Sequence, residues 1–351
     1  MNLFQIIWGS LGALLSILSF FPLINSTHWF FRLFDFIRLQ LLFLLLVLLV
    51  LGFIFTDYNA TGFTVLGVLL VSVVYQLIII SPYFPKRKSN HEASKNDITL
   101  LSINVMQKNN QYDKLIQLVK EVDPDILLTM ETNKNWEDNL RPLEAHYKQT
   151  IFVPKENRYG MHLYSKLPII EAQVHYLVAE DYPSIEVTLK DKNDQSFIFW
   201  GIHPPPPSPT EKSTSRQKDA ELMKVAKITN KATLPVVASG DFNNVAWSKA
   251  SKLFSKVSTL KDARINRGFH GTFPAQFWFL RFPIDLLFHS KQIKVKVLKV
   301  LSPVGSDHLP LLSKFEIISS SEQKEGIKDE QKEKADKMIM EGKKAVKEEN
   351  N

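Results

Sequence analysis

Residues 234–243, LPVVASGDFN, decide the fold class of this chain. The apolar half is short, uninterrupted and rich in valine, which is typical of a buried β-strand. The run ends at Asp241 and Asn243, where a strand would open into a loop. A strand end is a place from which a packed scaffold can aim a side chain accurately. The stretch therefore predicts a buried sheet that presents an acid and an amide at one edge.

The same pattern recurs along residues 97–318. Short apolar runs alternate with stretches of helical spacing such as 113–122, and strands dominate the later half, which indicates an α/β sandwich. Polar residues again stand at the ends of the apolar runs: Asn104 in LLSINV, Glu131 in METN, His203 in IHPPPP, Asp285 in PIDLLF, and Asp307 and His308 in GSDHLP.

Three apolar runs precede this domain, at about residues 3–23, 37–55 and 62–80. Each is long enough, or nearly so, to cross a bilayer core about 30 Å thick as a helix. None has a polar face that could meet water, so a soluble bundle is disfavoured. The start Met1-Asn2-Leu3 lacks the basic residues of a cleaved signal peptide. Residues 1–80 are therefore predicted to form three transmembrane helices.

The charges that flank these runs predict an orientation. Arg32 and Arg38 follow the first run, and Lys86, Arg87 and Lys88 follow the third, whereas the opposite loop offers only Asp57. The positive-inside rule then predicts a multi-pass protein of the inner (plasma) membrane with its catalytic domain in the cytoplasm.

The remaining boundaries follow from composition. Residues 81–96 are predicted to be a basic juxtamembrane linker that rests on anionic headgroups, and residues 97–318 a catalytic domain. Residues 319–351, rich in Lys, Glu and Asp, are expected to be a charged flexible tail, solvated and partly helical or disordered, with no chemistry of their own.

Overall composition excludes some chemistries and leaves others open. The chain has no cysteine, which rules out thiol catalysis, zinc-thiolate sites and disulfides. Its formal net charge of +7 suits a phosphate-bearing partner, although the lysines are spread along the chain without a dense basic stripe.

The polar residues at the strand ends suit phosphoester hydrolysis. That reaction requires phosphate charge to be neutralised, a water to be oriented in line, and the leaving oxygen to be protonated. Mg²⁺ prefers oxygen ligands such as carboxylates and amides. A histidine held by a carboxylate is suited to take the proton of the water.

In their order, LLSINV, METN, IHPPPP, SGDFN, PIDLLF and GSDHLP resemble the motifs of the endonuclease/exonuclease/phosphatase family. The IHPPPP turn and GDFNNVAWS are most similar to membrane-anchored bacterial members. The resemblance covers the whole soluble domain and implies a four-layer α/β sandwich, in which two packed β-sheets are flanked by helices, with the deoxyribonuclease I-like fold. It also implies a metal-dependent hydrolase acting on phosphoester bonds.

The resemblance assigns roles to individual residues. Asn104 and Glu131 would hold Mg²⁺ (or Mn²⁺), Glu131 directly, and Asp307 would support the metal or the histidine. Asp241 and Asn243 would orient the water and bind the scissile phosphate, while Asp285 would orient catalytic groups. His308 would be the general base, and His203 would help to protonate the leaving group.

Two features depart from this pattern or lie outside it. Leu286 stands where many members carry a polar residue, and no carboxylate partner for His203 is evident, Glu156 being a weak candidate. Residues 271–283, GTFPAQFWFLRFP, contain five aromatic side chains. These could stack on bases or enter a membrane interface, although a hydrophobic plug packed on the sandwich or on the anchor helices is slightly favoured.

Several functions stay open at this point. The leading prediction is a membrane-anchored phosphodiesterase or nuclease-like enzyme. The alternative is a phospholipid- or sphingomyelin-type phosphodiesterase, or a phosphatase, acting at the membrane. The expected partners are a phosphoester substrate (nucleic acid or a phospholipid headgroup) and membrane lipid around the N-terminal helices, with no obligate protein partner. A catalytically inactive membrane scaffold would have lost a metal ligand or His308, and neither is lost.

Overall fold

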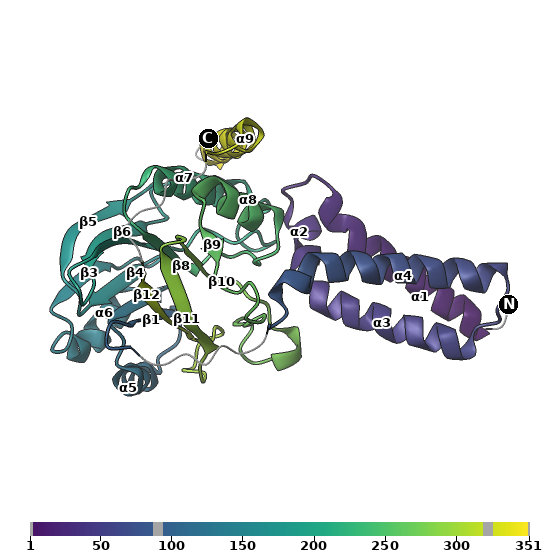
Figure 1. The fold of residues 1–351 in the computed structure, drawn as a ribbon, viewed down its shortest axis with the longest axis horizontal. Coiled ribbons are helices and arrows are strands. Elements are labelled where there is room, and N and C mark those ends of the chain that lie inside the picture. The colour runs from purple at the N-terminus through teal and green to yellow at the C-terminus, as the bar shows by residue number, and fades with distance from the viewer. Residues whose placement is uncertain (1–2, 87–93, 319–325, 350–351) are drawn as a thin grey trace. The chain divides into compact units, whose positions relative to one another are not determined.

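The computed structural model describes residues 3–86, 94–318 and 326–349, and it divides into two compact units, Met1–Phe84 and Pro85–Asn351 (Figure 1). Arg87 and Lys88 of the expected basic linker lie outside the described residues.

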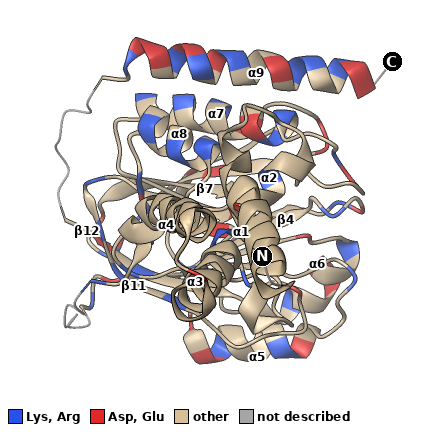
Figure 2. Ribbon diagram, turned by 90° about the vertical axis from the view of Figure 1, so that its right-hand side faces the viewer, with Lys and Arg blue, Asp and Glu red and all other residues tan. Residues whose placement is uncertain are grey.

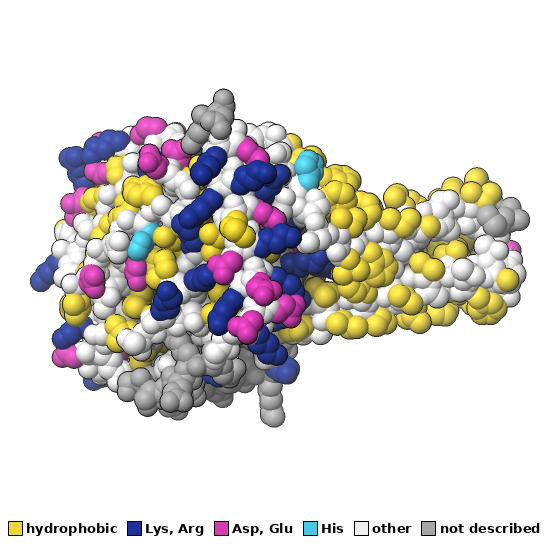
Figure 3. Space-filling model, turned by 90° about the horizontal axis from the view of Figure 1, so that it is seen from above, with side chains coloured by type: hydrophobic (Ala, Val, Ile, Leu, Met, Phe, Trp, Pro, Cys, Tyr) yellow, Lys and Arg dark blue, Asp and Glu magenta, His cyan; other side chains and the backbone are white. Residues whose placement is uncertain are grey.

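The first unit is built from long apolar helices. They are α1 (Leu3–Phe20), α3 (Arg38–Phe55) and α4 (Ala60–Ile80), with the short helices η1 (Phe21–Leu23) and η2 (Ser81–Tyr83) continuing α1 and α4. Three stretches, Leu3–Leu23, Arg38–Phe55 and Ala60–Tyr83, are long and apolar enough to cross a membrane, as predicted. Figure 3 shows that the surface of this unit is largely hydrophobic, whereas the second unit carries interspersed basic and acidic side chains.

The first unit also holds a helix and a polar network that the sequence analysis did not anticipate. Helix α2 (Trp29–Phe36) occupies the expected loop after α1, and His28 caps it by accepting a hydrogen bond from the Phe30 amide. Arg38, counted above as a flanking charge, is buried. It donates to Asp35 through Nε (3.1 Å) and Nη2 (2.9 Å), and to Gln76 through Nη1 (2.8 Å).

The second unit contains two six-stranded sheets in its described residues. One has the order β11-β12-β1-β2-β4-β3, and the other β5-β6-β7-β8-β10-β9. In each sheet one pair of central strands is parallel, β1 with β2 and β7 with β8. The strands are β1 (Ile98–Asn104), β2 (Ile126–Met130), β3 (Gln149–Val153), β4 (Met161–Ser165), β5 (Ile169–His175), β6 (Ser184–Lys190), β7 (Ser196–Ile202), β8 (Val236–Asp241), β9 (Lys261–Asp262), β10 (Asp285–His289), β11 (Ile293–Val300) and β12 (Leu311–Ile317).

The sheets pack face to face between helices, which confirms the predicted four-layer sandwich (Figure 1). Leu100 and Leu128 of one sheet share a buried core with Phe199 and Val237 of the other. The outer face of the first sheet is covered by α5 (Tyr112–Val122) and α6 (Lys134–Leu140), followed by η3 (Arg141–Leu143). Helices α7 (Arg216–Lys231) and α8 (Lys249–Ser258) cover the second sheet, and η4 (Trp278–Leu280) lies in the aromatic loop.

The described part of the charged C-terminal segment is one helix, α9 (Asp329–Glu349), which lies along α7 (Figure 2). A stripe of small residues makes this packing possible, since Ala335, Gly342 and Ala345 are its buried positions. A Cβ at Gly342 would lie 2.2 Å from the Cβ of Ala220 on α7. The expected tail is therefore helical in this region, and it packs on the domain instead of extending into solvent.

Candidate active site

The polar residues singled out in the sequence meet because of strand register. Asn104 ends β1 opposite Met130 of β2, so Glu131 follows immediately beside it. In the second sheet Ile202 lies opposite Gly240, which places His203 next to Asp241. Asp285 begins β10 directly opposite Asp241. The ends of the two parallel strand pairs, together with the start of the antiparallel strand β10, thus deliver these side chains to one edge of the sandwich.

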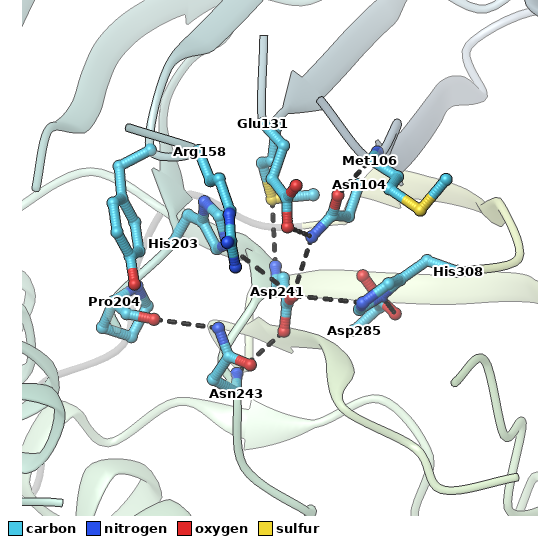
Figure 4. Close-up of polar contacts among 12 residues, drawn as sticks. Asn104, Met106, Glu131, Arg158, His203, Pro204, Asp241, Asn243, Asp285 and His308 are labelled. Atoms are coloured by element: carbon cyan, nitrogen blue, oxygen red, sulfur yellow. Dashed lines mark hydrogen bonds and ion pairs between the residues drawn. The ribbon is translucent and has the colours of Figure 1, made fainter. Parts of the chain in front are cut away.

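Asp241 lies at the centre of this cluster and is 1% exposed (Figure 4). Its Oδ1 accepts a hydrogen bond from the Asn243 amide (2.8 Å), and its Oδ2 accepts one from Asn104 Nδ2 (3.2 Å). Burial raises the pKa of Asp241 above its ordinary value, and the neighbouring His308 partly offsets this. Gly240 allows β8 to lie close to β7 just before Asp241. At its φ of 142°, a Cβ would lie 2.1 Å from the Ile202 carbonyl oxygen.

His308 forms a hydrogen-bonded pair with Asp285. Its Nδ1 lies 2.9 Å from Asp285 Oδ2, and its Nε2 lies 3.6 Å from Asp241 Oδ2. Burial alone would lower the pKa of His308, but the charges of Asp285 and Asp241 outweigh it and raise the pKa to about 10. The imidazole is therefore oriented by one carboxylate and faces another.

His203 lies against Asp241 in the same buried cluster. Its Nε2 is 3.8 Å from Asp241 Oδ2, and its ring packs against Tyr159 with a centroid separation of 5.3 Å. Burial lowers the pKa of His203. Its buried Nδ1 has no hydrogen-bond partner in the described part of the chain. Glu156, the weak candidate for its carboxylate, instead accepts hydrogen bonds from Asn133 Nδ2 and the Lys134 amide.

Glu131 completes the acidic side of the cluster. Its Oε1 accepts a hydrogen bond from Asn104 Nδ2 (3.0 Å), so a single amide group bridges Glu131 and Asp241. Its Oε2 accepts one from the Gln107 amide (3.0 Å). Burial raises the pKa of Glu131, and Asp307 is close enough to add to that effect. Glu131 also has φ 61°, a backbone conformation that costs free energy in a residue other than glycine.

The structure thus brings together the eight residues to which the resemblance assigns roles, but not Glu156. They are Asn104, Glu131, His203, Asp241, Asn243, Asp285, Asp307 and His308. Asn243 is fixed by a hydrogen bond from its Nδ2 to the Pro204 carbonyl oxygen (2.9 Å), which joins the SGDFN and IHPPPP segments (Figure 4).

The family model for the endonuclease/exonuclease/phosphatase family matches residues 101–308, more than half of the chain. The chain belongs to the endonuclease/exonuclease/phosphatase family. Members of this family are phosphoester hydrolases, and they typically use divalent cations.

Solved structures share the fold of this family domain. A family protein from Bacteroides vulgatus superposes with a TM-score of 0.53 at 20% identity, covering 64% of this chain and 100% of its own. Danio rerio TDP2 complexed with a single-strand DNA product superposes with a TM-score of 0.53 at 13% identity, covering 63% of this chain and 99% of its own. Bacteroides thetaiotaomicron mannosyl-6-phosphatase Bt3783 superposes with a TM-score of 0.50 at 21% identity, covering 62% of this chain and 99% of its own. None of the curated proteins matches the sequence.

The donor set of this endonuclease/exonuclease/phosphatase domain fits a hard divalent cation. Asp241, Asp285 and His308 offer ligand atoms within 4.8 Å of one another, and Asp285 Oδ1 is buried without a hydrogen-bond partner among the described residues. His308 and Asp285 already hydrogen-bond each other, however, whereas Glu131 lies at the more open side of the same cluster. Carboxylate and amide oxygens are the donors that Mg²⁺ prefers.

Other residues of the family domain support the site without having been predicted. Ser306 donates to the Asn104 carbonyl oxygen (2.7 Å) and accepts from the His308 amide (3.0 Å). Lys218 of α7 is almost fully buried and donates to the Asn243 carbonyl oxygen (3.0 Å). Ser306 lies within the GSDHLP motif, so its position next to His308 could have been predicted from the sequence. Nothing in the spacing of α7 signals the contact of Lys218.

The aromatic loop combines a packed base with an exposed tip. Phe273 packs on His308 with a ring centroid separation of 4.8 Å, and the Ala275 amide donates to the Asp307 carbonyl oxygen (2.7 Å). At the tip, Phe277, Trp278 and Phe279 are 53%, 78% and 57% exposed. The base of the loop therefore packs on the sandwich, as the plug interpretation predicts, whereas the tip does not pack on the sandwich.

Proposed function

We propose that this protein is a membrane-anchored, divalent-metal-dependent phosphoester hydrolase. The observation that carries the proposal is the cluster around Asp241: His203 and His308 face its carboxylate, and Asn104 links it to Glu131. With Asp285 and Asp307 included, the site has four carboxylates and two histidines, which supply oxygen donors and acid–base groups.

His308 is proposed to act as the general base. Asp285 accepts a hydrogen bond from Nδ1, so Nε2 is the nitrogen that faces Asp241. Its lone pair would become available for the water proton when a bound cation offsets the carboxylate charges that raise the pKa of His308. Asp241 and Asn243 would orient a water molecule. As the water oxygen bonds to phosphorus, His308 Nε2 would take its proton, and the phosphorus–oxygen bond to the leaving group would break.

His203 is proposed to supply the proton for the leaving oxygen. It lies on Asp241 Oδ2, as His308 does, so the two imidazoles flank one carboxylate. Burial lowers the pKa of His203, and an anionic phosphate beside it would raise that pKa and favour the protonated form.

Glu131 and Asn104, with Asp307, are proposed to hold the cation, Mg²⁺ or Mn²⁺. A bound divalent cation supplies positive charge that neutralises phosphate oxygens and counters the carboxylates which raise the pKa of His308. Asn104 and the Gln107 amide hold the Glu131 carboxylate in place from two sides.

The apolar helices are proposed to anchor the enzyme in the inner (plasma) membrane with residues 97–318, the catalytic domain, in the cytoplasm. Two substrate classes fit this proposal, nucleic acid and phospholipid headgroups. The exposed aromatic tip at Phe277, Trp278 and Phe279 favours lipid, because such side chains settle at a bilayer interface. The DNA product bound by Danio rerio TDP2 is the corresponding support for nucleic acid.

The test is hydrolysis of bis(p-nitrophenyl) phosphate by the full chain in detergent micelles, with Mg²⁺, with Mn²⁺ and with a chelator. Glu131→Ala and His308→Ala should each abolish activity while the protein stays folded. His175→Ala is the matched control, because His175 also pairs with a carboxylate, Glu186 at 2.6 Å, on the edge strand β5. Wild-type activity in either site variant, or full activity in the chelator, would contradict the proposal.

A substrate panel then separates the two classes. Vesicles containing phosphoinositides or sphingomyelin should be hydrolysed faster than single- or double-stranded DNA or RNA. Replacing Phe277, Trp278 and Phe279 with serine should slow hydrolysis in vesicles and leave bis(p-nitrophenyl) phosphate hydrolysis unchanged. Efficient cleavage of nucleic acid that is insensitive to these substitutions would assign the nuclease function instead.

A further inference from the structure

We propose that Arg158 is a specificity-determining residue that binds anionic oxygens of the substrate on the His203 side of the site. This inference rests on the proposed hydrolase function. Neither the strand-end pattern nor the roles implied by the family resemblance includes Arg158, which lies in the loop between β3 and β4.

The backbone of Arg158 is held in a conformation that arginine disfavours. Its φ is 72°, in the left-handed region, where a residue other than glycine costs about 1 kcal/mol or more. Its amide donates to Gln107 Oε1 (2.6 Å), and the Gln107 amide in turn donates to Glu131 Oε2 (3.0 Å). Gln107 therefore links the position of Arg158 directly to the proposed cation ligand.

The guanidinium group of Arg158 is held by one ion pair, and part of its hydrogen-bonding capacity is unused. Nη1 donates to Glu211 Oε1 (2.9 Å), and the side chain is 54% exposed. In the described part of the chain Nε and Nη2 have no acceptor. A guanidinium held through one nitrogen keeps other donors available for a phosphate, which it can bind with two parallel hydrogen bonds.

Glu211 also fixes where this guanidinium lies relative to the histidine. Its Oε2 accepts a hydrogen bond from the Tyr159 hydroxyl (2.6 Å), and the Tyr159 ring packs on His203. Figure 4 shows the Arg158 side chain extending from its loop toward the part of the cluster where His203 lies. Arg158, Tyr159 and Glu211 thus form a wall next to the proposed proton donor.

The excess of carboxylates in the cluster explains why an arginine next to it would help an anionic substrate to bind. The cluster around Asp241 is rich in carboxylates, which repel an anionic substrate. The nearby Lys218 is buried and already donates to the Asn243 carbonyl oxygen. Arg158 is partly exposed at the rim, so it can meet a phosphate that enters. An ordinary surface ion pair would explain the Glu211 contact, but it would not explain the strained backbone.

Arg158→Gly is the decisive variant, because glycine adopts this φ freely and folding is preserved. With bis(p-nitrophenyl) phosphate and Mg²⁺, we expect KM to rise about tenfold or more with little change in kcat. Arg158→Lys, which keeps the charge and loses the planar fork, should lie between wild type and Arg158→Gly. Guanidinium ion added at concentrations too low to denature should lower the KM of Arg158→Gly and leave that of wild type unchanged.

Arg141→Ala is the matched control, since Arg141 pairs with Asp138 at 2.8 Å and is 66% exposed at a distance from the site. An unchanged KM in Arg158→Gly, or the same KM increase in Arg141→Ala, would overturn the assignment. A wild-type chain without activity in any metal would instead contradict the proposed function, so the two failures are distinguishable.

Discussion

Buried charges occur in both units of this protein, but they are balanced in one and unbalanced in the other. In the helical unit, Arg38 meets Asp35, and Gln76 takes a further guanidinium nitrogen. At the edge of the sandwich, carboxylates gather around Asp241 and two imidazoles face it, but burial lowers the pKa of His203, so only His308 is favoured in its charged form. The first network cancels its own charge, whereas the second carries an excess of negative charge.

This difference separates a structural from a functional use of buried charge. A paired and hydrogen-bonded arginine stabilises its surroundings as long as both partners are present. A cluster of like charges opposes folding, and a protein keeps one where chemistry needs it. The positive φ of Glu131 and of Asn243 adds backbone strain at the same place. The excess charge and the strain support the proposal that the strand ends bind a cation and an anionic substrate.

The largest effect is expected when the unbalanced cluster loses its central charge. Asp241→Asn preserves shape and can still accept the Asn243 amide, yet it removes the carboxylate that both histidines face. We expect kcat/KM with Mg²⁺ to fall by about 1000-fold or more. The melting temperature without metal should change little, because removal of a buried like-charge interaction is opposed by loss of the hydrogen bond that Oδ2 accepts from Asn104.

Asp191→Asn provides the matched comparison. Asp191 is also buried, but its Oδ1 accepts the Asn193 and Gln195 amides (2.8 Å each) in the turn after β6. This variant should keep its activity. If Asp241→Asn instead unfolded the domain, or if both variants lost activity equally, the distinction between the two kinds of buried charge would fail.

The balanced network should respond in the opposite way. Arg38→Met leaves Asp35 buried without its partner and should destabilise the helical unit by about 4 kcal/mol. Because the chain has no cysteine, Leu45→Cys, at a fully buried position of α3, can report opening of the unit through its rate of thiol labelling in micelles. Arg38→Met should accelerate labelling, and adding Asp35→Asn should reverse part of the increase. An unchanged labelling rate would show that the pair contributes nothing.

How much of this could be read from the sequence depends on the distance between partners. The three helices long and apolar enough to cross a membrane, and the strand ends, were predictable, because apolar runs and the polar residues that stop them are local signals. The helix α2 was missed because its aromatic residues resemble a continuation of the apolar unit. The wall formed by Arg158 and Glu211 was missed because 53 residues separate the two, and no spacing rule predicts that pair.

A third kind of buried charge sharpens the comparison. Glu221 of α7 accepts a hydrogen bond from the Ser184 hydroxyl (2.9 Å), and its Oε2 is buried without a partner among the described residues. Burial raises the pKa of this carboxyl to about 7. A single buried acid with no other carboxyl group beside it can avoid its desolvation cost by taking up a proton. The interacting carboxylates around Asp241 cannot all do so at once.

The smallest predicted effect follows from that pKa. Because the folded state holds the Glu221 proton more tightly than the unfolded chain, stability should fall as the pH rises from about 4.5 to about 7, and the full cost is present above pH 7. Glu221→Gln stays neutral, so its stability should lack this part of the pH dependence. Above pH 7 its free energy of unfolding should exceed that of wild type by at most about 3 kcal/mol. Chemical denaturation at several pH values measures the difference, while activity should be unaffected. Parallel pH profiles for the two proteins would mean that Glu221 is already ionised when folded, and an isolated buried carboxylate would then be tolerated here without protonation.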